Sequence, residues 1–172
     1  ETRLMPRVGF AASAAYGAFV MLLCVALVHG ETETSVSISM HYNRWAWAIA
    51  YLVVPLVVIE AAPRRGRSAD GLVIGLGLAA LALIKLTYFV SLAPAVLAGL
   101  LVRRQWRTLL WSVAAGLAVA AVVTAFAGVS FWMAYLSDIL TVNASPVRPR
   151  PGDTFGAVAA SPANMGGTLV LL

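Results

Sequence analysis

Long apolar runs alternate with short polar segments along most of the chain. A membrane-spanning helix needs about 20 mostly apolar residues. Three runs come close to or exceed this length, at Val8–Val28, Trp45–Ala62 and Thr108–Val129. The second begins with aromatic residues, which are typical of the interface between membrane and water. The pattern therefore predicts three full transmembrane helices.

A fourth apolar run, Gly71–Val102, is too long for one span. As a single helix it would measure about 48 Å, against a hydrocarbon core of about 30 Å. Positive loops tend to stay in the cytoplasm, and arginines stand at both ends of this run: Arg64, Arg65 and Arg67 before it, Arg103, Arg104 and Arg107 after it. Both ends therefore lie on one side, and residues 71–102 are predicted to form a pair of short helices, Gly71–Ile84 and Tyr88–Val102, that turn at Lys85–Thr87.

The same rule orients the whole chain. The N-terminus, Pro63–Asp70 and Arg103–Arg107 are predicted to be cytoplasmic, which places eight of the 12 Lys and Arg residues inside. The segments at residues 30–44 and 130–164 are then outer loops. We expect an integral protein of the bacterial inner membrane whose N-terminus faces the cytoplasm.

The outer segment at residues 130–164 has two parts. Apolar and aromatic residues recur at helical spacing from Phe131 to Leu140 and predict an interfacial helix on the outer surface. Prolines then exclude helix over Ser145–Gly152 and predict an extended loop that carries Arg148 and Arg150.

Composition narrows the class of protein. Apolar residues make up 61% of the chain and charged residues 11%, against about 45–50% and 25% in soluble domains. These shares exclude a typical soluble enzyme, a disordered tail and a nucleic-acid-binding module. The net charge of +5 is attributed to cytoplasmic arginines that face anionic lipid.

We therefore predict an all-α, polytopic transmembrane helix bundle that forms a single integral-membrane domain over residues 1–172. It would have about five complete membrane helices, two of them short, and a truncated final one. The chain begins with Glu1, and its last apolar segment, Met165–Leu172, is too short to cross a bilayer. We therefore expect a piece of a longer protein.

Lys85 is the sharpest candidate for function. A lysine inside an apolar run costs a few kcal/mol and marks a functional site by default. It would contact a phosphate of a lipid-linked substrate near the outer face. The alternative is that its long side chain only reaches the membrane surface.

Arg148 and Arg150 are further candidates for phosphate binding, since arginine binds phosphate with two hydrogen bonds. The alternative is a solvated basic loop.

The first outer loop contains candidates for other chemistry. His29, Glu31, Glu33 and His41 could in principle hold a divalent metal, but their spacing matches no compact metal motif. No cofactor or metal is therefore predicted. Glu31 and Glu33 are candidates for a general base.

Small residues at helical spacing predict close helix packing. One such set is Gly71 and Gly75. The other set is formed by Ala114, Ala118, Ala121 and Ala125.

Four features together resemble a known enzyme family. An apolar helix ends in Lys85, a short helix that contains Pro94 follows, and the basic turn Arg103–Arg107 leads to the next span; His41–Trp47 stands before an earlier span. This pattern, over roughly residues 41–152, resembles polytopic glycosyltransferases of the GT-C fold, especially the mannosyltransferase-like family 87 and related bacterial membrane proteins.

The resemblance implies a hexosyl- or pentosyltransferase that uses a polyprenyl-phosphate-linked sugar at the outer face, with Lys85 at the carrier phosphate. Such enzymes carry an acidic catalytic residue in their first large outer loop, which the resemblance does not place in this sequence. Two alternatives stay open: a transporter or flippase with residues 71–102 as a re-entrant gate, and a non-catalytic subunit of polysaccharide assembly.

Overall fold

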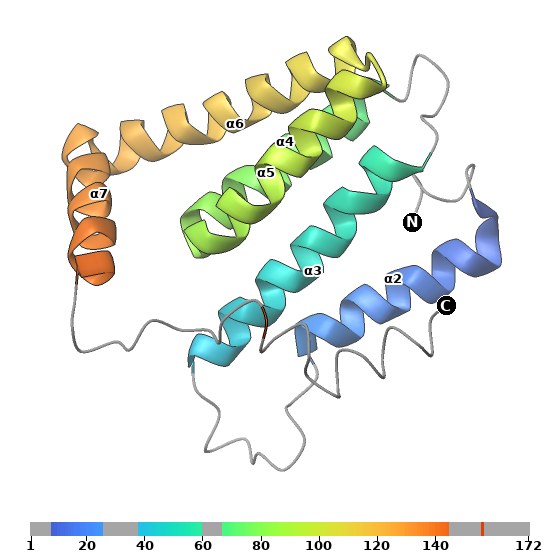
Figure 1. Cartoon of the computed structure of the whole chain (residues 1–172), viewed down its shortest axis with the longest axis horizontal. Helices are drawn as coiled ribbons and strands as arrows, with labels where there is room; N and C mark the ends of the chain where they lie inside the picture. The colour runs from blue at the N-terminus through green and yellow to red at the C-terminus, as the bar shows by residue number, and fades with distance from the viewer. Residues whose placement is uncertain (1–7, 26–37, 60–66, 145–155, 157–172) are drawn as a thin grey trace. The chain divides into compact units, whose positions relative to one another are not determined.

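The computed structural model describes residues 8–25, 38–59, 67–144 and 156. Within these ranges every regular element is a helix and no strand occurs, which confirms the all-α class (Figure 1). The helices are α2 (Phe10–Val25), α3 (Ile38–Val58), α4 (Arg67–Ile84), α5 (Leu86–Val102), α6 (Trp106–Ala127) and α7 (Val129–Ala144). The chain divides into two compact units, Glu1–Phe126 and Ala127–Leu172.

The long apolar run contains two helices that are separated by one residue. Lys85 has an extended backbone (φ −155°, ψ 94°), and its carbonyl accepts the N–H of Tyr88 at 3.0 Å in the first turn of α5. Helix α4 begins at Arg67 rather than Gly71, and α5 begins at Leu86 rather than Tyr88. With 18 and 17 residues they are about 27 and 26 Å long, close to the thickness of a hydrocarbon core.

Helices α3, α4 and α5 pack around one apolar core. Val53 and Ile74 are fully buried in it and pack with Val96 and Leu100 of α5. Ile74 precedes Lys85 and Val96 follows it, so this contact shows that α4 and α5 fold back on each other. Helix α2 packs against α3. The hydroxyl group of Tyr16 on α2 donates a hydrogen bond to the backbone carbonyl of Tyr51 on α3.

Helix α4 meets α6 at two glycines. A Cβ atom added at Gly71 would collide with the backbone oxygen of Thr108, and one at Gly75 would collide with that of Ser112. This close approach confirms the packing role predicted for the two glycines. The alanine prediction was wrong for the described residues: Ala115 is the buried alanine of α6, and the four predicted positions are exposed. The glycines of α4 contact the face of α6 that carries Thr108, Ser112 and Ala115. The four predicted alanines lie on another face of α6, which α4 does not cover.

The predicted outer loop at residues 30–44 is helical from Ile38 onward. Helix α3 therefore extends beyond the apolar run that starts at Trp45. Tyr42 and Asn43, in this added turn, contact the Lys85 side chain, and these contacts stabilise the longer helix.

Two helices, α4 and α6, are long and apolar enough to cross a membrane. Helices α2, α5 and the segment Val129–Val142 are apolar but shorter. Except for Val129, helix α7 lies within the predicted outer segment at residues 130–164. Its aromatic rings form a cluster in which Phe131 stacks on Tyr135, with 6.1 Å between the ring centroids.

Candidate functional site

The Lys85 side chain lies between the start of α3 and the start of α5. It is half-buried, and its ammonium group donates a hydrogen bond to Oδ1 of Asn43. The ring centroids of Tyr42 and Tyr88 lie 5.1 and 5.6 Å from its Nζ atom. We call Tyr42, Asn43, Trp47, Lys85 and Tyr88 the Lys85 cluster.

Local helix geometry explains how the Lys85 cluster forms. Trp47 follows Asn43 by four residues, so the two side chains share one face of α3. The indole N–H of Trp47 donates to the hydroxyl oxygen of Tyr88, which holds α5 against that face. Because Lys85 is the one residue between α4 and α5, its position follows from the packing of both helices on α3.

The positive charge of Lys85 has only neutral partners in the part of the chain that the structure describes. These partners are an amide oxygen and two aromatic rings. A cation over an aromatic ring gains about 0.5–2 kcal/mol, more as the site is desolvated. These contacts orient the ammonium group, and no carboxylate of the described residues neutralises it.

An apolar groove begins next to the Lys85 cluster. Its volume is about 350 Å³, and it is lined by Trp47, Ala50, Tyr51 and Val54. These residues follow one another at helical spacing on a single face of α3. Trp47 lines the groove and also donates to Tyr88 of the Lys85 cluster, so the groove lies next to this cluster on α3.

The other candidate residues are placed as follows. Glu31, Glu33, Arg148 and Arg150 lie outside the described residues, as does His29. His41 is described, and its ring lies 6.3 Å from that of Trp45. In the described ranges no group of three or more His, Cys, Asp or Glu side chains could hold a metal ion.

Sequence reasoning missed Tyr42, Asn43 and Tyr88 as site residues. A signal was present: all three stand at the ends of apolar runs that the charge distribution places on the same side as Lys85. Their identity as partners required the pairing of α3 with α5, which no local pattern shows.

Comparison of the chain with models of protein families, with curated proteins and with solved structures finds no match. The geometry of the Lys85 cluster therefore carries the functional argument.

Proposed function

We propose that this chain is part of a polytopic membrane glycosyltransferase that uses a polyprenyl-phosphate-linked sugar. The observation that carries the proposal is the charge of Lys85, which has neutral partners and lies where two apolar helices meet. The donor's phosphate would pair with this charge, and its hydrocarbon chain would lie in the groove along α3.

Exposed apolar side chains support a membrane setting. On α6, Leu110, Leu117 and Phe126 are 70%, 65% and 90% exposed. Soluble monomers rarely expose many large apolar side chains close together, since contact between apolar surface and water is unfavourable. In a bilayer the same side chains would contact lipid tails. We place the Lys85 cluster at the outer face of a bacterial inner membrane, because most arginines fall on the other side in this arrangement.

The proposed reaction is a direct glycosyl transfer. A base takes the proton from the acceptor hydroxyl, whose oxygen then forms a bond to the anomeric carbon of the sugar. The bond between that carbon and the phosphate oxygen breaks, and the lipid phosphate leaves with the electron pair. Lys85 would stabilise the negative charge that develops on the leaving phosphate. Glu31 and Glu33 remain candidates for the base.

A lysine-specific experiment tests this role, because Lys85 is the only lysine in the sequence. In the full-length protein, we expect Lys85→Met to lower sugar transfer from a polyprenyl-phosphate donor by at least about a hundredfold, the effect of losing a strong electrostatic contact in the transition state. Arg44→Gln, which removes a cation from the same end of α3, is the matched control and should retain transfer within about threefold.

A binding measurement accompanies the transfer assay. Polyprenyl phosphate should protect Lys85 from an amine-reactive reagent, as read by peptide mass spectrometry, and free sugar should not. Full transfer by the Lys85→Met protein, or labelling that polyprenyl phosphate leaves unchanged, would contradict the proposal.

The break at Lys85 also favours a second candidate. Discontinuous helices are typical of substrate sites in transporters. A flippase would move a polyprenyl-phosphate lipid between leaflets in vesicles without forming a new glycosidic bond, and transport would then depend on Lys85.

A further inference from the structure

A second group of cations lies at the other end of α5. Arg103 and Arg104 form the turn after α5, and Arg107 lies in the first turn of α6. All three are exposed. Helix α5 has 17 residues, so this turn is about 26 Å from Lys85 along the helix axis. That separation is close to the thickness of a hydrocarbon core.

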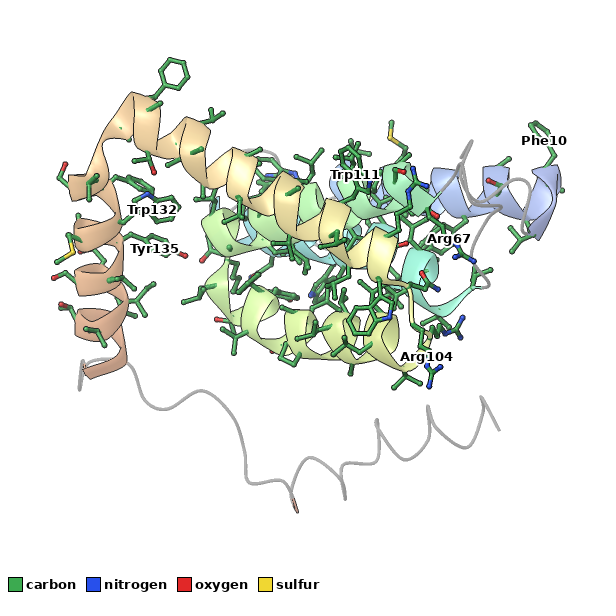
Figure 2. All side chains as sticks on the ribbon, turned by 90° about the horizontal axis from the view of Figure 1, so that it is seen from above. Phe10, Arg67, Arg104, Trp111, Trp132 and Tyr135 are labelled. Atoms are coloured by element: carbon green, nitrogen blue, oxygen red, sulfur yellow. The ribbon has the colours of Figure 1, made fainter. Side chains whose placement is uncertain are left out.

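The backbone holds this turn in a constrained shape. The N–H groups of Arg104 and Gln105 donate to the carbonyls of Leu101 and Leu100, at 3.0 and 2.9 Å. Arg104 has φ +50° and is the non-glycine residue with positive φ among the described residues. These two hydrogen bonds form a Schellman motif, a common helix end whose left-handed residue is usually glycine. A larger side chain at that position is disfavoured. Figure 2 shows Arg104 at this turn, on the same end of α4–α6 as Arg67.

The three arginines combine charge with neighbouring apolar surface. In the described part of the chain no carboxylate pairs with any of them. Trp106 is 57% exposed between them, and Val102 is 84% exposed one residue before the turn. Tryptophan beside arginine at the end of an apolar helix is typical of the interface between headgroups and acyl chains.

We infer that the turn Arg103–Arg107 binds the headgroup phosphate of an anionic phospholipid, in the leaflet opposite to the Lys85 cluster. Guanidinium groups bind phosphate oxygens through paired, charge-assisted hydrogen bonds. Val102 and Trp106 would contact the acyl chains of the same lipid, which a nucleic acid or a free phosphate does not have. The inference rests on the membrane setting of the proposed function and does not depend on glycosyl transfer or on phosphate binding by Lys85.

Native mass spectrometry of the whole chain in detergent micelles tests this site. The probes are phosphatidylglycerol and phosphatidylcholine with identical acyl chains. We expect the anionic lipid to bind more tightly. The variant Arg103→Gln/Arg104→Gln/Arg107→Gln should weaken its binding about a hundredfold, since each arginine near an anionic lipid surface contributes about fivefold. Arg44→Gln, the matched control at the opposite end, should change it less than twofold.

Two further measurements keep the inference falsifiable. If the triple Gln variant does not fold, the charge-retaining variant Arg103→Lys/Arg104→Lys/Arg107→Lys should keep most of the preference, and Arg107→Gln alone should lose about fivefold. Equal binding of both lipids by the unaltered chain would overturn the inference. So would an unchanged preference in the Gln variants, or glycerol phosphate without acyl chains binding as tightly as the lipid.

Discussion

Lys85 and Arg104 both follow an apolar helix, but their backbones differ. Lys85 has φ −155°, an extended conformation that any residue adopts, so its identity is explained by its side-chain contacts. Arg104 has φ +50°, where glycine is favoured. The sequence has a charged side chain at a position where the backbone disfavours any side chain. A contact between the guanidinium group and a partner outside the chain, such as the proposed lipid headgroup, would offset this backbone cost.

The strain at Arg104 leads to a stability prediction. We expect Arg104→Gly to be more stable than Arg104→Ala by about 1 kcal/mol, because both remove the charge and only glycine relieves the left-handed backbone. Unfolding of each variant in detergent, followed by circular dichroism, measures the difference. An alanine variant at least as stable as the glycine variant would show that Arg104 is not strained.

At the scale of elements, the contact between α4 and α6 depends on two missing side chains. Gly71 and Gly75 let α4 approach the backbone of Thr108 and Ser112. Thr108 and Ser112 are themselves buried. Small residues allow such close approach, and packing then supplies the attraction between helices in a bilayer. Gly116 on α6 has open space around its Cα atom and plays no part in the contact.

This difference between glycines gives a matched pair of variants. Gly75→Ala should destabilise the protein by about 1–3 kcal/mol, because its Cβ atom would strike the backbone of Ser112. Gly116→Ala should be neutral or should stabilise α6 by up to about 1 kcal/mol through helix propensity. Thermal unfolding in detergent compares the two; similar effects at both positions would argue against the α4–α6 contact.

At the scale of the molecule, the fold-back at Lys85 places the start of α4 and the end of α5 on the same side of any membrane that these helices cross. Asn43 at the start of α3 contacts Lys85, so these two segments share a side. The arginines of the turn after α5 share the other side with the start of α4. In the proposed membrane setting, the excess of arginines would make that second side cytoplasmic.

Cysteine labelling tests this arrangement in a Cys24→Ala background, which removes the single native thiol. In intact cells a membrane-impermeant maleimide should label Thr87→Cys and should not label Ser68→Cys. Permeabilised cells should show labelling of both. Equal labelling of the two positions in intact cells would contradict a double crossing by α4 and α5.

Run length and the positions of arginines are properties of the sequence alone, and they were enough to predict helices and a break near Lys85. A helix needs only local hydrogen bonds, and its apolar length is read directly along the chain. The packing role of Gly71 and Gly75 was also predictable, since glycines four apart on a helix share a face.

The partners of Lys85 were not predictable, because Asn43 is 42 residues away in the sequence. Such a contact depends on how α3 packs against α4 and α5, and that packing is the sum of many small contacts that no single segment contains. The contact between α4 and α6 likewise determined that Ala115, rather than its neighbours, is buried on α6.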